Sequence, residues 1–134
     1  MKAYLSVPMI ANRALERARL MAAVIEKAGY DLMSPWVVGP IETADPKVLN
    51  VFQRDKKGAE DSDVIVADVS EPSTGVGMEI MAAYIAGRRI VLVARKGSRH
   101  SQMLSHMEGA ELIEFGDERE LEAKLFQVLT RRAT

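Results

Sequence analysis

One stretch, residues 62–93, limits what this chain of 134 residues can fold into more than any other. It begins with Ser-Asp-Val-Ile-Val-Ala-Asp-Val, an apolar run rich in β-branched residues that is typical of a strand buried on both faces. The turn Glu-Pro-Ser-Thr-Gly follows, and from Val76 to Gly87 the apolar spacing is helical. A second buried run starts at Ile90. The stretch therefore predicts a strand, a glycine-rich loop, a helix and a parallel strand joined by a right-handed crossover.

The segments on either side predict further strands and helices in alternation. We expect strands at 3–7, 30–33 and 111–115, the last at an edge, helices at 13–27, 46–61 and 118–132, and a short helix at 103–107. Asn12 is the expected N-cap of the first helix. Residues 34–46 form a long loop with three prolines, which predicts a functional or mobile segment. We predict one α/β domain over residues 1–134, a three-layer α/β/α fold of the flavodoxin or Rossmann-like kind with a parallel sheet of about five strands.

The composition excludes several classes of protein. The formal net charge is −1, so nothing favours a nucleic-acid polymer or an anionic membrane surface as a partner. The chain has no cysteine, which excludes disulfides, thiol catalysis and thiolate metal sites, and His100 and His106 lie apart from any acidic cluster. No run approaches the roughly 20 apolar residues of a membrane span, and the first residues are too short an apolar run for a signal peptide. We expect a cytoplasmic protein without a metal or cofactor.

Glu79 is a charged residue in a position where the neighbouring residues are small or apolar. We expect it in the first turn of a helix, among small and apolar residues, above the carboxyl end of a strand, where open parallel sheets bind ligands. One interpretation is that it complements the positive end of the helix dipole. The other is functional, because Gly75 and Gly77 let a ligand approach the backbone and the free N–H groups there favour an anion. Trp36, the only tryptophan, belongs either to the core or to a pocket wall or subunit contact.

Several of these motifs occur together in one known family. They are Asp55, the strand at 62–69, the run Pro-Ser-Thr-Gly-Val-Gly-Met-Glu at 72–79 and the run Gly-Arg-Arg-Ile-Val-Leu-Val at 87–93. In this combination the chain resembles the nucleoside 2-deoxyribosyltransferase superfamily over nearly its whole length. The branch it resembles most is that of the 2′-deoxynucleoside 5′-phosphate N-hydrolases.

The resemblance implies a catalytic role for three residues. Glu79 corresponds to the nucleophile, which attacks the anomeric carbon of a (deoxy)ribosyl nucleotide and forms a glycosyl-enzyme ester. Asp55 corresponds to the acid that protonates the departing base or holds the water or acceptor, and Tyr4 to the tyrosine that orients the nucleophile. Carboxyl groups about 5 Å apart favour such a double displacement, and an acid of raised pKa can protonate a leaving group near neutral pH. Asp68, which ends the central strand, either touches the sugar or caps the loop.

The choice of branch depends on Ser73. Deoxyribosyltransferases tend to carry an aspartate here, which binds a free 5′-hydroxyl but repels a phosphate. Ser73, with the amides of Thr74, Gly75 and Gly77, is expected to accept a 5′-monophosphate. The resemblance also implies a second phosphate-binding serine from the neighbouring subunit. It corresponds by motif to Ser105, with Ser101 as a competitor because the preceding loop is longer, and it implies a homodimer with a shared active site.

The chain departs from the N-hydrolase pattern after Tyr4. A Gly-Ser-Ile-Arg stretch is absent, and Ile10 occupies the position of the arginine that contacts the phosphate. Arg13 either replaces that arginine or is a solvated helix residue. Met9, Ile10 and Trp36 could form an apolar wall against the base.

Three functions follow in order of preference. The first is an N-glycosidase that hydrolyses a nucleoside 5′-monophosphate to a free base and a (deoxy)ribose 5-phosphate. The second is a deoxyribosyltransferase, in which a second base replaces water. The third is a non-catalytic nucleotide-binding or sensing domain on the same scaffold. The preferred base, and the choice between ribose and 2′-deoxyribose, stay open at this point.

Overall fold

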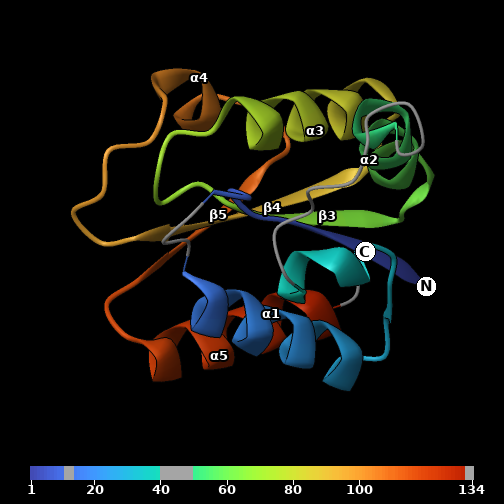
Figure 1. The fold of residues 1–134 in the computed structure, drawn as a ribbon. Helices are drawn as coiled ribbons and strands as arrows, with labels where there is room; N and C mark the ends of the chain where they lie inside the picture. The colour runs from blue at the N-terminus through green and yellow to red at the C-terminus, as the bar shows by residue number, and fades with distance from the viewer. Residues whose placement is uncertain (11–13, 40–49, 132–134) are drawn as a thin grey trace.

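A computed structural model describes residues 1–10, 14–39 and 50–131, which form a parallel sheet with helices on both faces (Figure 1). The strands are β1 (Lys2–Ser6), β2 (Asp31–Leu32), β3 (Val64–Asp68), β4 (Arg89–Arg95) and β5 (Glu111–Phe115). The helices are α1 (Leu15–Lys27), η1 (Pro35–Val38, a 3-10 helix), α2 (Val51–Asp61), α3 (Thr74–Ile85), α4 (Gln102–Ser105) and α5 (Glu118–Thr130). The predicted three-layer α/β fold is confirmed. No helix within the described ranges is long and apolar enough to cross a membrane.

The strand order, β2-β1-β3-β4-β5, determines where a ligand can bind. All neighbouring strands are parallel, and β5 lies at an edge as predicted. The order is that of flavodoxin-like sheets, in which the chain turns in opposite directions after β1 and β3 and leaves a crevice at their carboxyl ends. Ser6 pairs with Ala67 near the ends of these two strands. The crevice therefore lies between the segment after Ser6 and the segment after Asp68.

Two hydrophobic cores lie on opposite faces of the sheet. The α1/α5 face is covered by α1, η1 and α5, and the α2/α3 face by α2, α3 and the short α4 (Figure 1). Successive side chains of β1 alternate between them, because Ala3 and Leu5 belong to the first core and Tyr4 to the second. All residues of β3 are buried, which confirms the prediction of a strand covered on both faces.

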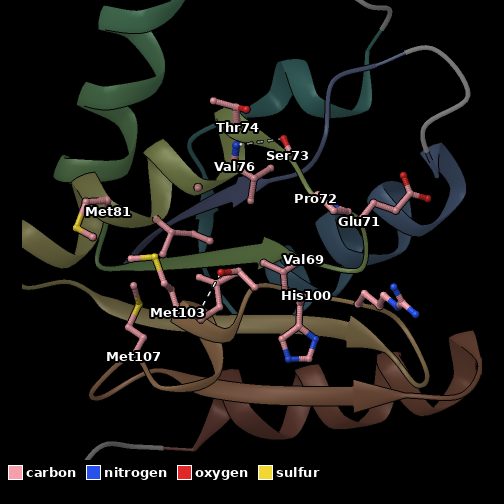
Figure 2. Close-up of a pocket in the computed structure, with 15 residues that line it drawn as sticks. Val69, Glu71, Pro72, Ser73, Thr74, Val76, Met81, His100, Met103 and Met107 are labelled. Carbon is pink, nitrogen blue, oxygen red and sulfur yellow. Dashed lines mark hydrogen bonds between the residues drawn. The ribbon is translucent and has the colours of Figure 1, made fainter.

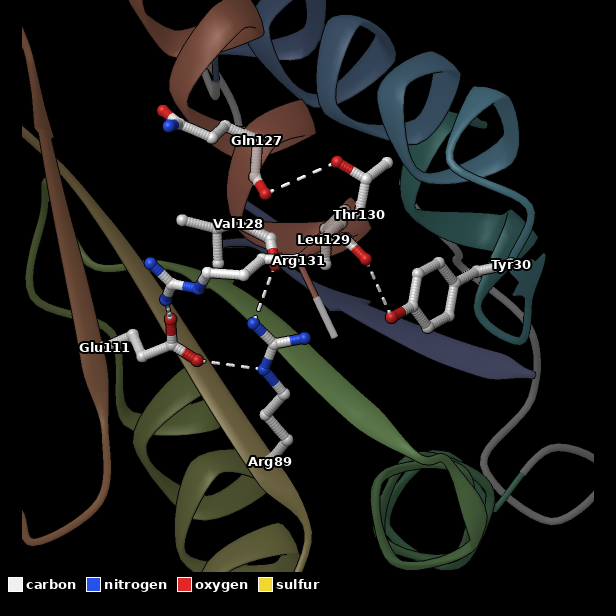
Figure 3. A network of polar contacts seen from close by, with 8 residues as sticks. All are labelled: Tyr30, Arg89, Glu111, Gln127, Val128, Leu129, Thr130 and Arg131. Atoms are coloured by element: carbon white, nitrogen blue, oxygen red, sulfur yellow. Dashed lines mark hydrogen bonds and ion pairs between the residues drawn. The ribbon is translucent and has the colours of Figure 1, made fainter. Parts of the chain in front are cut away.

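A polar network anchors α5 at the end of the sheet opposite the crevice (Figure 3). Arg89, the first residue of β4, pairs through Nε with Glu111 Oε1 at 2.8 Å and donates to the Val128 carbonyl at 2.7 Å. The Tyr30 hydroxyl donates to the Leu129 carbonyl at 3.1 Å. These donors satisfy carbonyls in the last turn of α5, which have no partner within the helix. The network is structural, since it joins β4, β5 and α5 at their far ends.

The start of α3 differs from the prediction. The helix begins at Thr74 and not at Val76, because the Ser73 hydroxyl accepts a hydrogen bond from the Val76 N–H at 3.3 Å and caps it. The two glycines of the motif therefore belong to the helix and not to a loop, and the prediction that Glu79 lies in the first turn was wrong. In the second turn the helix dipole acts on Glu79 only weakly, which disfavours the purely electrostatic interpretation.

Two further boundaries differ. Residues 35–38 form the 3-10 helix η1 inside the predicted loop. The Asn50 side chain accepts from the Gln53 N–H at 2.9 Å and caps α2. The predicted helix starts at Pro46 and Arg13, and the cap at Asn12, lie outside the described residues.

Candidate active site

A cavity of about 550 Å³ lies in the crevice at the carboxyl ends of β1 and β3. Its walls come from the segment after β1, from the first turn of α2 and from the start of α3. The lining residues are Val7, Pro8, Met9, Ile10, Val51, Arg54, Asp55, Pro72, Ser73, Thr74, Gly75, Val76 and Glu79. The volume suits a small-molecule ligand. The fold thus brings Glu79 and Asp55, which are 24 positions apart in the sequence, to the same cavity.

The Glu79 carboxyl has an unusual environment. Burial raises its pKa from the ordinary value to about 7. Hydrogen bonding from the hydroxyls of Tyr4 and Ser6 and the charge of Arg54 lower the pKa, whereas the charge of Asp55 raises it. Near neutral pH both the acid and the carboxylate form of Glu79 are populated, as is common for groups that take part in catalysis.

Tyr4 lies behind Glu79 and is fully buried. Burial, and then the adjacent Glu79 charge, raise the pKa of the Tyr4 phenol far above its ordinary value, so the phenol keeps its proton and can donate. Its ring packs edge-on against Trp36, with 6.2 Å between ring centroids. On the other side it touches α2 at Gly58, where an added Cβ would come within 2.7 Å of Tyr4 Cε2. The ring is therefore held from two sides, next to Glu79.

Arg54 is a site residue that the sequence analysis missed. Its Nε contacts Asp55 Oδ1 at 2.8 Å, and its guanidinium lies 3.9 Å from the centroid of the Trp36 ring. The only signal in the sequence was its position next to Asp55. Trp36 packs against Tyr4 and Arg54 and does not line the cavity.

The start of α3 forms the wall of the cavity opposite the segment after β1. Ser73 accepts from the Val76 N–H through its oxygen, which leaves its own O–H able to donate. The amides of Thr74 and Gly75 belong to the first turn, where N–H groups have no partner within the helix. Ser73, Thr74 and Gly75 therefore present donors at a cavity wall, an arrangement that suits an anion.

No family model matches the chain. Over 97 residues it is 34% identical to a protein of Thermofilum pendens named "Putative 2′-deoxynucleoside 5′-phosphate N-hydrolase 1", an alignment that covers 70% of this chain and 68% of that protein. The chain belongs to the 2′-deoxynucleoside 5′-phosphate N-hydrolase family. This membership confirms the resemblance drawn from the sequence, and with it the prediction of an enzyme of the nucleotide N-glycosidase or deoxyribosyltransferase type.

Solved structures show the same fold at lower identity. The CMP N-glycosidase of Clostridium botulinum superposes with a TM-score of 0.69 at 19% identity and covers 93% of this chain and 98% of that one. The 2-deoxyribosyltransferase of Bacillus psychrosaccharolyticus superposes with a TM-score of 0.71 at 20% identity and covers 96% of both chains.

A second cavity, of about 600 Å³, lies beside the first in this N-hydrolase family member (Figure 2). Both cavities share Pro72, Ser73, Thr74 and Val76 as lining residues. The second is otherwise mostly apolar, and its thioether side chains come from α3 and from the region of α4: Met81, Met103 and Met107.

The remaining predicted residues lie in different places. Gly77 lines the second cavity and not the first, and so does Ser101. Ser105, the serine expected from a neighbouring subunit, is exposed and lines neither cavity of its own chain. Met9 and Ile10 line the first cavity, and Arg13 lies outside the described residues.

Asp68 has a structural role in this chain. Its Oδ1 accepts from the Ser70 N–H at 3.0 Å, and its Oδ2 pairs with Arg17 Nε at 2.8 Å. The carboxyl group is nearly fully buried, with both oxygens in use. Of the two interpretations offered from the sequence, the structure favours the loop cap.

Proposed function

We propose that this protein is an N-glycosidase that hydrolyses the N-glycosidic bond of (deoxy)nucleoside 5′-monophosphates. The products are a free base and (deoxy)ribose 5-phosphate. One observation carries the proposal: Glu79, Asp55 and the donors at the start of α3 line a single cavity. Two carboxyl groups on one glycosidic bond, with an anion site on the same wall, are what such a hydrolysis requires.

The reaction proceeds in two displacements. Ionised Glu79 attacks the anomeric carbon, the C–N bond breaks with its electron pair going to the base, and Asp55 supplies the proton that the base takes up. Asp55 then removes a proton from water, the water oxygen attacks the anomeric carbon of the ester, and the Glu79 carboxylate leaves. Tyr4 orients Glu79 from behind and keeps its own proton throughout.

The 5′-phosphate binds at the start of α3. The Ser73 hydroxyl and the Thr74 and Gly75 amides donate to its oxygens, and no carboxylate stands at position 73 to repel it. Met9 and Ile10 cover the other side of the ligand with apolar surface. The name of the Thermofilum pendens relative agrees with a 5′-phosphorylated deoxynucleoside as the substrate.

The test is incubation of the purified protein with ribo- and deoxyribonucleoside 5′-monophosphates, with chromatography for released base. Parallel reactions hold unphosphorylated nucleosides and a second free base. We expect free base from a monophosphate and none from the matching nucleoside. Base exchange between nucleosides would instead assign the protein to deoxyribosyl transfer. Nucleotide binding without either reaction would refute catalysis and favour a sensing domain.

We further propose that the enzyme is a homodimer that joins through α2 and α3. These helices expose apolar side chains beside the site, among them Phe52 at 56%, Met78 at 52% and Ile85 at 77% exposure. A groove of about 530 Å³ between the helices reaches Asp55 and Glu79, so a partner seated there would also close the active site.

Light scattering on a sizing column tests the dimer. Ile85→Glu should yield a monomer, because it places a charge in the apolar interface, whereas Leu112→Glu, at an exposed leucine on β5, should leave the dimer intact. Mixing inactive Glu79→Gln and Ser105→Ala protomers tests the sharing of sites. Recovered activity would support a serine supplied across the interface, and none would contradict it.

A further inference from the structure

Ser6, the last residue of β1, carries a hydroxyl that the fold itself does not use. The side chain is fully buried, at 0% exposure. Its hydroxyl has no hydrogen-bond partner of full geometry among the residues that the structure describes. Buried polar groups are nearly always paired, and leaving one unpaired lowers stability. An alanine would fill this position without that cost, so the hydroxyl needs another explanation.

The hydroxyl lies beside Glu79. Tyr4 and Ser6 are two positions apart on β1, so their side chains point to the same face of the sheet, toward α2 and α3. Hydrogen bonding from both hydroxyls lowers the pKa of Glu79 and opposes the effect of burial. The other groups that face the carboxyl are Asp55, which raises this pKa, and Arg54, which lowers it.

The two hydroxyls belong to side chains outside the cavity, so they approach Glu79 from the protein interior. Glu79 lines the cavity, whereas neither Ser6 nor Tyr4 does. One strand thus supplies two donors behind a carboxylate whose front is open to the substrate. Contacts of this kind often lack ideal geometry in a protein without its substrate and tighten when the substrate binds.

We infer that Ser6 is a positioning residue for Glu79: its hydroxyl donates to one carboxylate oxygen, so that the other oxygen faces the anomeric carbon. This inference rests on the proposed function of Glu79 as the nucleophile. A donor held behind the carboxylate favours the ionised form of Glu79 in the free enzyme. It also stabilises the carboxylate again when the glycosyl ester is hydrolysed and Glu79 leaves.

The matched pair of variants is Ser6→Ala and Ser34→Ala. Ser34 is also fully buried, but its hydroxyl donates to the Leu5 carbonyl and accepts from the Leu5 N–H, each at 2.8 Å. We expect Ser34→Ala to lower the melting temperature and Ser6→Ala to leave it unchanged or raise it. If Ser6→Ala destabilises the protein as Ser34→Ala does, the hydroxyl is structural and the inference is overturned.

The activity of Ser6→Ala should fall about tenfold or more in kcat, with little change in KM, since hydrogen bonds to a charged group are among the stronger ones. The acid limb of the pH profile of kcat/KM should move to higher pH. Ser6→Thr, which keeps the hydroxyl, should retain more activity than Ser6→Ala. Full activity with an unmoved profile in Ser6→Ala would overturn the inference.

A direct titration separates this inference from the proposed function. Carbon-13 NMR of labelled glutamate carboxyls, with the Glu79 signal assigned by its loss in Glu79→Gln, measures the pKa of Glu79 without turnover. We expect a higher pKa in Ser6→Ala than in the wild type. An unchanged pKa refutes the contact whether or not the enzyme is active. If the wild type releases no base from any monophosphate but the pKa moves, the proposed function fails and the Ser6 contact stands.

Discussion

The two faces of the sheet differ in how completely their apolar side chains are buried and their buried hydroxyls are hydrogen-bonded. On the α1/α5 face, α5 buries a complete apolar stripe of Leu121, Leu125 and Leu129, and the phenol of Tyr30 is hydrogen-bonded. On the α2/α3 face, Tyr4 is equally well enclosed, but its hydroxyl has no full hydrogen bond within the described part of the chain, and the covering helices expose Ile85 and other large apolar side chains. The α1/α5 face therefore buries its apolar side chains and pairs its buried phenol, as stability favours. The α2/α3 face does so less completely around Glu79.

The serines repeat the same contrast. Ser34, under η1, makes two hydrogen bonds to β1, whereas Ser6, at the end of the same strand, makes none of full geometry with the residues that the structure describes. The fold uses the Ser34 hydroxyl to hold the backbone of β1, and it leaves the Ser6 hydroxyl to Glu79. We therefore interpret the α2/α3 face as the one where stability is given up for chemistry and for a partner, and the α1/α5 face as the one that keeps the domain folded.

The largest expected effect is that of Glu79→Gln. Replacing the proposed nucleophile by an isosteric amide should reduce base release at least about 1,000-fold, since covalent catalysis would be lost, while the melting temperature should not fall. Release of base from a monophosphate, followed by chromatography, is the measurement, and circular dichroism is the control for folding. Turnover within tenfold of the wild type would remove Glu79 from the mechanism.

Leu125→Ala is the counterpart on the α1/α5 face. Leu125 is fully buried in the middle of α5, so its truncation should lower the free energy of unfolding by about 2 to 5 kcal/mol. Urea denaturation measures the loss. Because the residue lies on the far side of the sheet from the cavity, kcat per folded molecule should stay near the wild-type value. A large drop in kcat with little loss of stability would contradict the assignment of stability to the α1/α5 face and of catalysis to the α2/α3 face.

The pH dependence of stability tests whether the buried Glu79 carboxylate lowers the free energy of unfolding. Its pKa is raised by burial from the ordinary 4.5 to about 7, so the folded state holds the proton more tightly than the unfolded state does. This contribution to stability is complete below about pH 4.5 and is lost as the pH rises through 7. Relative to Glu79→Gln, the wild type should therefore lose about 2 to 3 kcal/mol between pH 4.5 and 8.

Taking the difference between the two proteins at each pH cancels the other titrating groups. The variant should be the more stable of the two at pH 8. A difference that does not change with pH would show that Glu79 is as well solvated in the fold as in the unfolded chain.

The sequence predicted the fold because its signals are local. The β-branched run of β3 and the glycines after α1 and α3 mark elements almost to the residue. The start of α3 escaped prediction because two glycines at 75 and 77 suggested a loop, while the Ser73 cap gives the helix its first turn.

The residues of the candidate site that belong to a sequence motif could be predicted, and the other residues could not. Glu79 stood out from its position in the sequence, Asp55 and Ser73 were assigned through the resemblance to a known family, and all three line one cavity. Arg54 and Ser6 have no such signal, because their roles depend on contacts that only the packed sheet creates. Trp36 was left undecided for the same reason, since its surroundings come from β1 and α2.

The smallest predicted effect compares two helix glycines. Gly58 in α2 faces the Tyr4 ring, where an added Cβ would lie 2.7 Å and 2.9 Å from two ring carbons, whereas a Cβ at Gly77 in α3 meets nothing within 4 Å. Alanine favours a helix over glycine by up to about 1 kcal/mol, so Gly77→Ala should stabilise the protein by a few tenths to 1 kcal/mol. At Gly58 the clash outweighs that gain, and we expect a net loss of about 1 kcal/mol.

Measuring kcat as well as the melting temperature of these two variants shows whether the Tyr4 ring serves packing alone or also catalysis. Because Tyr4 is held between Gly58 and Trp36, Gly58→Ala must displace the ring that we propose orients Glu79, and kcat should fall more than the loss of stability explains. Thermal melts and base release on the same preparations give both quantities. If Gly58→Ala melts lower yet keeps full kcat, Tyr4 serves the packing of the α2/α3 face and not its chemistry. If both the melting temperature and kcat of Gly58→Ala decline while Gly77→Ala melts higher, the close contact at Gly58 links the packing of this face to the position of Glu79.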